Sequence, residues 1–93
     1  MAITILFTGK GVKQEQYDGV IRDLEAAGAS APSGRRYHVA SALPDGWCVV
    51  DVWDSQTQFE RFAQTLVPLL KKHQINNMEP QFLPTHNIIV GES

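Results

Sequence analysis

Residues 46–55, with the sequence GWCVVDVWDS, constrain the fold more than any other part of the chain. Their β-branched and aromatic content predicts a strand, whose side chains alternate between two faces. One face carries Cys48, Val50 and Val52. The other carries a mixed set: Trp47, Val49, Asp51 and Trp53. A strand with one solvated face alternates apolar and polar residues, whereas this strand is apolar on both faces, so both faces of its sheet need cover.

The length of the chain indicates where the second cover comes from. Ninety-three residues are enough for one domain, and we expect residues 1–93 to form a single unit. Hydrophobic residues make up 43% and charged residues 19%, as in an ordinary globular protein. A domain of this size has room for about two helices, which cover one face of a sheet. We therefore expect a homodimer that buries the other sheet face against a second copy.

Several classes of partner are disfavoured by composition. The net charge is −2 and the basic residues are scattered, so no nucleic acid is expected. The single Cys48 permits no internal disulfide and no multi-cysteine metal site, and its valine neighbours predict a small buried side chain. The N-terminal residues do not resemble a signal peptide, and no apolar run is long enough to span a membrane. We expect a cytoplasmic protein without a metal or cofactor.

Hydrophobic periodicity predicts two helices and four strands. The first strand covers residues 2–8, the first helix 13–27 with Gly28 after it, and the second strand residues 35–43. Ser55, with Gln58 three residues later, is typical of a helix start, and apolar residues at helical spacing continue the second helix to about residue 70.

Prolines mark the second half of the chain. Pro68 falls inside the second predicted helix and should kink or split it. Residues 79–90 read as an extended strand interrupted by Pro80 and Pro84, which suits an edge position. The resulting order, β-α-β-β-α-β, predicts an α+β, ferredoxin-like fold: an antiparallel sheet with both helices on one face.

The turn Pro44-Asp45-Gly46 joins two strands into a hairpin and sets which side chains share a face. A three-residue loop places Leu43 opposite Trp47. Tyr37 and Val39 then share the aromatic face with the tryptophans, while His38 lies on the other face with the small residues. In that register we expect the small-residue face to meet the helices and the aromatic face to stay open for the dimer. A two-residue turn would move one strand to the opposite assignment.

The hairpin leading into residues 46–55, together with Phe59-x-x-Phe62 in the next helix, resembles the dimeric α+β barrel superfamily. More narrowly, the chain is similar to small bacterial proteins related to antibiotic biosynthesis monooxygenases. The segments Pro32-Ser33-Gly34 and 66–70 fit the same pattern, so the resemblance spans nearly the whole chain. It implies two four-stranded sheets facing each other across a dimer axis, with a cavity between sheet and helices. The superfamily includes cofactor-free oxygenases of polyketide quinones, haem-degrading monooxygenases, small isomerases and proteins of unknown activity.

Two polar residues in the predicted sheet are candidates for acid–base chemistry. His38 is either a hydrogen-bonded structural residue or a proton carrier in a pocket. Asp51 stands among valines and needs a partner, because burying an unpaired carboxylate is costly. Arg35 or a group of the partner subunit could supply it. Both residues are therefore candidate catalytic residues, with a structural ion pair as the alternative for Asp51.

Aromatic residues are the candidates for substrate binding. Trp47 and Trp53 are core or interface residues, or they stack on a flat substrate. Tyr17 on the first helix and Phe62 on the second are candidates for the same role. Haem-degrading relatives use a histidine on the second helix, for which His73 is the candidate, but the first strand lacks the asparagine of those relatives.

Three hypotheses for function follow. The resemblance favours a cofactor-independent, monooxygenase-like enzyme acting on an aromatic or quinone-like compound. The second hypothesis is a non-catalytic ligand-binding or stress-response homodimer. The third is a haem-binding or haem-degrading protein with His73 as the iron ligand. The three histidines have no local metal-ligand spacing, and the chain contains neither a phosphate-binding loop nor a nucleophile elbow.

Overall fold

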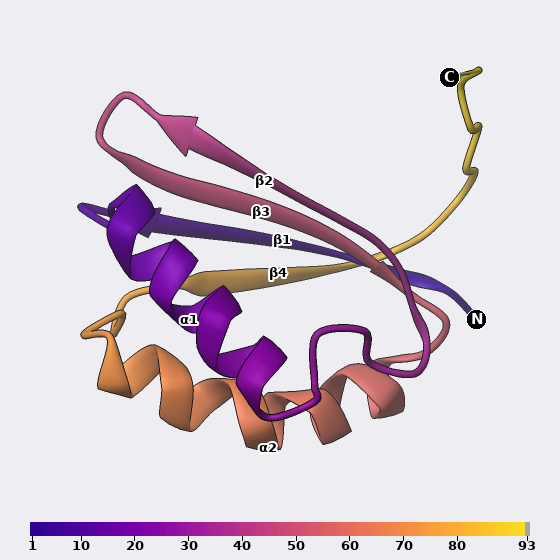
Figure 1. Cartoon of the computed structure of the whole chain (residues 1–93). Helices are drawn as coiled ribbons and strands as arrows, with labels where there is room; N and C mark the ends of the chain where they lie inside the picture. The colour runs from indigo at the N-terminus through magenta and orange to yellow at the C-terminus, as the bar shows by residue number, and fades with distance from the viewer. Residues whose placement is uncertain (93) are drawn as a thin grey trace.

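The computed structural model of the chain describes residues 1–92. Six elements follow one another: β1 (Ile3–Lys10), α1 (Gln14–Ala26), β2 (Arg35–Leu43), β3 (Gly46–Trp53), α2 (Gln56–Lys72) and β4 (Glu79–Pro84). The strands form one antiparallel sheet in the order β2-β3-β1-β4, and both helices lie on the same side of it (Figure 1). The ferredoxin-like α+β arrangement predicted from the sequence is therefore confirmed.

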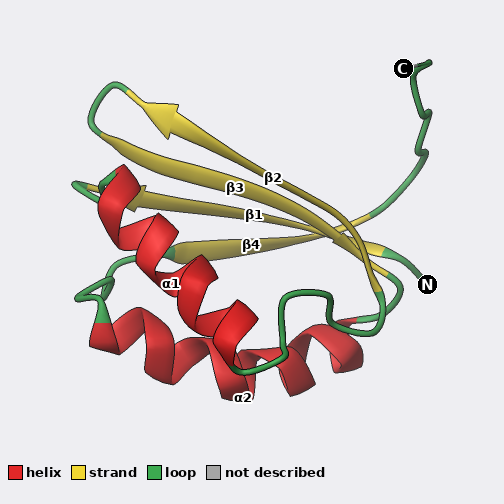
Figure 2. Ribbon diagram, viewed as in Figure 1, coloured by secondary structure: helices red, strands yellow, loops and turns green. Residues whose placement is uncertain are grey.

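The strand β4 is an edge strand, as its two prolines predicted. It is shorter than expected, because residues 85–90 have no regular structure. The partner strand β1 begins at Ile3, which lies opposite Pro84. Beyond this pair the Thr85 N–H still donates to the Ala2 carbonyl oxygen over 3.1 Å, and the regular strand ends there. Figure 2 shows the C-terminal segment leaving the body of the molecule there as a loop.

The helix boundaries follow the local signals, with one exception. The hydroxyl oxygen of Ser55 accepts a hydrogen bond from the backbone N–H of Gln58 at the start of α2. Gly28 has a φ of +71°, which ends α1 in the left-handed conformation that glycine tolerates. The exception is Pro68: α2 runs as one helix across it, so the expected split into two segments is wrong. Packing of the apolar side of α2, where Phe59 and Phe62 are buried, compensates for the backbone hydrogen bond that proline cannot make.

The β2–β3 hairpin turns through two residues, not three. Leu43 pairs with Gly46, which leaves Pro44 and Asp45 as the loop. Our prediction that Leu43 lies opposite Trp47 is wrong by one residue. Because side chains alternate along a strand, this shift transfers residues 37–43 of β2 to the opposite face. His38 therefore shares a face with Asp51, and Tyr37 does not share a face with the tryptophans.

The sheet face that meets the helices is also the reverse of our expectation. Along β3 the alternate residues 47, 49, 51 and 53 are buried, and they lie on the helix side. The open face carries Cys48, Val50 and Val52, which are half-buried, so Cys48 is not the buried core residue that we expected. The physical reason is that the indole rings carry the larger apolar area, and the two helices provide the thicker cover.

The core between sheet and helices is largely aromatic at the Trp53 end. Trp53 is fully buried, and its ring lies 5.6 Å from that of Phe59 in an edge-on arrangement and 5.4 Å from that of Phe62. Ile5 on β1 is also fully buried. No helix within residues 1–92 combines the length and the apolar character needed to cross a bilayer.

Candidate functional site

A cavity of about 280 Å³ lies between the sheet and the two helices. Its wall is almost entirely hydrocarbon, contributed by both helices, by single residues of β1, β3 and β4, and by the segments before α1 and β4. The polar exceptions come from four side chains: Tyr17, Arg35, His38 and Asp51, joined by the indole of Trp47. Ligand sites in proteins have this composition, an apolar pocket with a few placed polar groups. An engineered cavity of about 150 Å³ accommodates benzene, so this one has room for a bicyclic ring system.

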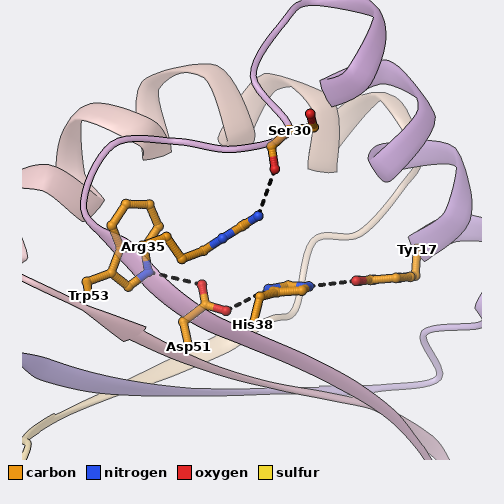
Figure 3. Close-up of polar contacts among 6 residues, drawn as sticks. All are labelled: Tyr17, Ser30, Arg35, His38, Asp51 and Trp53. Carbon is orange, nitrogen blue, oxygen red and sulfur yellow. Dashed lines mark hydrogen bonds and ion pairs between the residues drawn. The ribbon is translucent and has the colours of Figure 1, made fainter. Parts of the chain in front are cut away.

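Three of the polar residues form a continuous hydrogen-bonded line (Figure 3). Asp51 Oδ1 lies 2.6 Å from His38 Nδ1, and His38 Nε2 lies 2.6 Å from the Tyr17 hydroxyl. The rings of Tyr17 and His38 are nearly parallel, at 9°, with centroids 6.0 Å apart. His38 and Asp51 meet because they are directly paired residues of β2 and β3, and Tyr17 reaches them from α1. We call this line the Tyr17–His38–Asp51 relay.

The direction of the protons in the relay follows from its donors and acceptors. The Asp51 carboxylate only accepts hydrogen bonds, so His38 carries its proton on Nδ1. In the neutral imidazole Nε2 is then an acceptor, and the Tyr17 hydroxyl donates to it. A proton gained by Nε2 would convert His38 into an imidazolium beside a carboxylate, an arrangement that stabilises the charged ring. The relay can therefore accept a proton through Tyr17.

Trp53 fixes the far end of the relay. Its indole N–H donates to Asp51 Oδ2 over 3.1 Å, so both carboxylate oxygens have partners. This satisfies a carboxylate that is only 4% exposed. Trp53 is itself absent from the cavity wall. Of the two tryptophans predicted to hold a substrate, Trp47 lines the cavity, whereas Trp53 orients an acidic residue.

Arg35 reaches the cavity because of an irregularity in β2. The pairing with β3 shifts between residues 35 and 37, so that Arg35 lies opposite Trp53 and Tyr37 opposite Val52. A β-bulge of this kind re-aims side chains. It turns Arg35 to the helix side, where its guanidinium lies 5.7 Å from the centre of the Phe62 ring and donates to the Ser30 carbonyl oxygen over 2.9 Å.

The sequence suggested Arg35 as a partner of Asp51, and the observed partner is His38. Arg35 is instead a cation at the wall of an apolar cavity. Sequence reasoning missed this placement, because regular alternation would have put Arg36 on the inner face. Arg36 lies outside, where it forms an exposed ion pair with Asp54 at 2.6 Å.

The environment of Tyr17 affects its acidity. Burial raises the pKa of the phenol above its ordinary value of 10.0; the Arg35 charge lowers it, and the Asp51 and Asp18 charges raise it. Burial disfavours the charged phenolate, because the cavity solvates it poorly. Tyr17 is therefore a neutral hydrogen-bond donor at neutral pH.

Trp47 sits among small neighbours. Its paired residues are Ala42 on β2 and Gly9 on β1, which leave space for the indole. The ring packs against Tyr17 with centroids 5.3 Å apart. Trp47 is only 9% exposed. Its Nε1 is the one buried side-chain polar atom without a hydrogen-bond partner among the residues that the structure describes.

Phe62, the remaining predicted binding residue, lines the cavity from α2. His73 does not line it. His73 Nε2 lies 2.8 Å from Asp23 Oδ2, and Lys72 Nζ lies 2.9 Å from the same oxygen, so the three link α1 to the end of α2. Within residues 1–92 no three acidic, histidine or cysteine side chains cluster closely enough to hold a metal ion.

Comparison with known proteins finds likeness in structure only. Neither a protein-family model nor a curated protein sequence matches this chain. Among solved structures it is similar to SnoaB, a cofactor-independent oxygenase from Streptomyces nogalater, with a TM-score of 0.66 and 12% identity over 95% of each chain. A candidate antibiotic biosynthesis monooxygenase from Chloroflexus aurantiacus has a TM-score of 0.62 and 19% identity, over 96% of this chain and 99% of that one.

A third such protein, a candidate antibiotic biosynthesis monooxygenase from Deinococcus radiodurans, has a TM-score of 0.62 and 11% identity, with both chains covered completely. At these identities the likeness shows the fold. The chain has the ferredoxin-like α+β fold of antibiotic biosynthesis monooxygenase-like proteins, as the resemblance in its sequence implied.

Proposed function

We propose that this protein binds a bicyclic aromatic compound bearing a phenolic hydroxyl and oxygenates it with O₂, without a cofactor. The observation that carries the proposal is the Tyr17–His38–Asp51 relay at the wall of an apolar cavity. A cavity of this size and composition suits a flat ring system, and the relay supplies a route for a proton. The likeness to a protein described as a cofactor-independent oxygenase supports the same class of reaction.

The role of the relay is to ionise the substrate. The oxygen of Tyr17 takes the phenolic proton while its own proton passes to His38 Nε2, over the 2.6 Å that separates the two atoms. Asp51 stabilises the imidazolium that forms. Because the proton moves through Tyr17, no free tyrosinate is needed, which agrees with the raised pKa of that phenol. The Arg35 guanidinium at the wall favours the substrate anion electrostatically.

The electrons come from the substrate. A naphtholate transfers one electron to O₂, and the radical pair forms a C–O bond at the ring carbon para to the oxygen. The relay returns its proton to the peroxide. It then removes the C–H proton from that carbon as the O–O bond breaks and hydroxide leaves. The relay passes this proton to the hydroxide, which becomes water. One phenol and one O₂ thus yield one quinone and one water.

The first test is oxygen uptake with 1,5-dihydroxynaphthalene, an electron-rich bicyclic phenol. The expected products are one hydroxynaphthoquinone and one water for each O₂ consumed, measured by an oxygen electrode and by the quinone absorbance. Tyr17→Phe and His38→Gln should each lower kcat by about 10²-fold or more, the usual contribution of a positioned proton carrier. The parent protein and all variants carry Cys48→Ser, since a free thiol would react with the quinone product.

Tyr37→Phe is the matched control, because it removes the same hydroxyl from a residue that lies outside the cavity. It should retain the parental rate. Binding of the phenol without oxygen uptake would favour the non-catalytic ligand-binding hypothesis instead. Full activity in Tyr17→Phe would refute the relay.

We also propose that the protein is a homodimer that pairs through the open face of the sheet. That face is apolar around Val50 and Val52, and Val39 on β2 is 57% exposed. Apolar patches of this kind mark association surfaces in soluble proteins. The occupant we infer is a second copy of the chain, because small domains gain stability by association and the face is continuous over all four strands.

A further inference from the structure

Arg35 is the cation of the cavity wall, and no acidic side chain within residues 1–92 neutralises it. The ion pairs in this part of the chain involve Arg36, Lys72 and two histidines, and none of them includes Arg35. Its side-chain hydrogen bond goes to the Ser30 carbonyl oxygen, over 2.9 Å, and uses one end of the guanidinium. The remaining N–H groups of the planar fork are left for a partner from outside the chain.

Three observations place the charged end of this side chain at the cavity. The central carbon of the guanidinium lies 5.7 Å from the centre of the Phe62 ring, and both residues line the cavity. Although burial raises the pKa of Tyr17, the Arg35 charge acts to lower it, so the guanidinium is within electrostatic reach of the phenol. Figure 3 shows the Arg35 side chain on the helix side of the sheet, alongside His38 and Asp51. The residue is half-buried, which leaves it accessible to a molecule in the cavity.

We propose that Arg35 binds a carboxylate of the ligand, so that the compound taken by this cavity is an aromatic carboxylic acid whose phenolic hydroxyl meets the relay. The proposal rests on the proposed function in taking the cavity as the ligand site, and it names the ligand class more narrowly. It makes Arg35 a specificity-determining residue. Guanidinium and carboxylate match in shape, because two parallel N–H groups meet two coplanar oxygens.

The charge balance of the wall favours a ligand group with a single negative charge. The two lining residues that carry a charge at neutral pH are Arg35 and Asp51. The Asp51 residue is only 4% exposed and its oxygens are occupied by His38 and Trp53, so it does not compensate the guanidinium. One cation neutralises one carboxylate. A phosphate dianion would keep an uncompensated charge in an apolar cavity, which is costly.

A packing role accounts for only part of this residue. The hydrogen bond to Ser30 ties the loop between α1 and β2 to the sheet, and the guanidinium packs near the Phe62 ring. The amide of a glutamine can donate to the same carbonyl oxygen without bringing a charge to an apolar wall, where desolvation of a charge costs free energy. The charge therefore points to a ligand group of opposite sign, and Arg35→Gln separates the two roles.

The test is a calorimetric binding comparison with an isosteric pair of probes, 2-naphthoate and 2-naphthamide. The two probes share the ring system and the planar substituent, and they differ by the negative charge. The parent protein should bind 2-naphthoate about tenfold more tightly or better, the effect of a hydrogen bond to a charged group. Arg35→Gln should remove that preference and change the affinity for 2-naphthamide by less than about threefold.

Arg36→Gln is the matched control, because it removes the same charge from the neighbouring residue, which pairs with Asp54 on the outside of the sheet. It should keep the parental preference for 2-naphthoate. Arg35→Lys keeps the charge without the planar fork, so its preference should fall between those of the parent and Arg35→Gln. Equal affinity of the parent protein for the two probes would overturn the proposal without any variant. An equal loss of both probes in Arg35→Gln would also overturn it, since Arg35 would then act by packing alone.

The two proposals fail separately. Oxygen uptake that depends on Tyr17 and His38, combined with equal binding of the two probes, would leave the relay intact and refute the carboxylate site. A preference for 2-naphthoate that depends on Arg35, without oxygen uptake from 1,5-dihydroxynaphthalene or from 5-hydroxy-1-naphthoate, would support the carboxylate site and refute catalysis. Thermal unfolding followed by circular dichroism checks that each variant is folded before its affinities are compared.

Discussion

At the scale of single residues, the site depends on which hydrogen-bonding groups are satisfied within the chain. Asp51 looked anomalous in the sequence because it stands among valines on a central strand. The structure resolves this with two donors, one from His38 and one from Trp53. Tyr17, which the sequence marked as an aromatic binding residue, lines the cavity and is also one end of the relay.

The acidity of Tyr17 tests this description directly. In a Tyr37→Phe background Tyr17 is the remaining tyrosine, and its titration should lie above the ordinary pKa of 10.0, chiefly because burial disfavours the phenolate. Adding Asp51→Asn should lower that pKa, because a negative charge near the phenol is removed. The measurement is the ultraviolet absorbance change on phenolate formation, with circular dichroism recorded in parallel.

The raised pKa of Tyr17 also determines how the stability of the fold depends on pH. The unfolded chain loses the Tyr17 proton first, so the contribution of this group to stability is present below pH 10.0 and is lost as the pH rises through the folded-state pKa. A Tyr17 titration at or below the ordinary value would show that the phenol is solvated, and would contradict its placement against the cavity.

At the scale of elements, the β2–β3 hairpin decides the chemistry of the site. A two-residue turn pairs His38 with Asp51, and the bulge near Arg35 then turns the guanidinium inward. The turn end of the hairpin also lies close against the backbone of β1. The Gly46 position leaves no space there, since an added Cβ would lie 2.2 Å from the Gly9 carbonyl oxygen.

We therefore expect Gly46→Ala to lower the free energy of unfolding by about 2–3 kcal/mol, because backbone atoms of β1 must move to admit the methyl group. Urea unfolding followed by circular dichroism measures the effect. Gly91→Ala is the control, because nothing lies within 4 Å of its added Cβ. Unfolding midpoints that are equal for the two variants would show that the strands tolerate a side chain at residue 46.

At the scale of the whole molecule, the helices cover one face of the sheet and leave the other open (Figure 2). The covered face carries the rings and the acidic residue, and the open face carries the smaller apolar residues. Residues 46–55 thus carry apolar side chains on both faces, as predicted. The face that meets the helices and the face that stays open are exchanged relative to our prediction. The proposed dimer would supply the second cover.

Val39→Glu tests that dimer. We expect the parent protein to sediment as a dimer at micromolar concentration and the variant as a monomer, because a charge without a partner is costly in an apolar interface. Val90→Glu makes the same change at a residue that is 69% exposed on the C-terminal segment, and it should leave the dimer intact. A parent protein that sediments as a monomer would remove the sheet face as an interface between copies.

Local chemistry made much of the fold predictable. The Ser55 cap, the glycine that ends α1 and the prolines of β4 each act over three or four residues, so the sequence alone determined the element order and the edge position of β4. Residue types and the family resemblance identified six candidate site residues; His38, Asp51, Tyr17, Trp47 and Phe62 line the cavity, and Trp53 does not.

Only the tertiary structure decided how those candidates meet. Pro44-Asp45-Gly46 is compatible with a loop of two or three residues, and a change of one residue inverts a whole strand. The free energy that selects between the registers comes from burying the indole rings under the helices, which is a long-range term that no local signal encodes. The bulge that turns Arg35 inward and the donor of Trp47 that has no partner both follow from that packing.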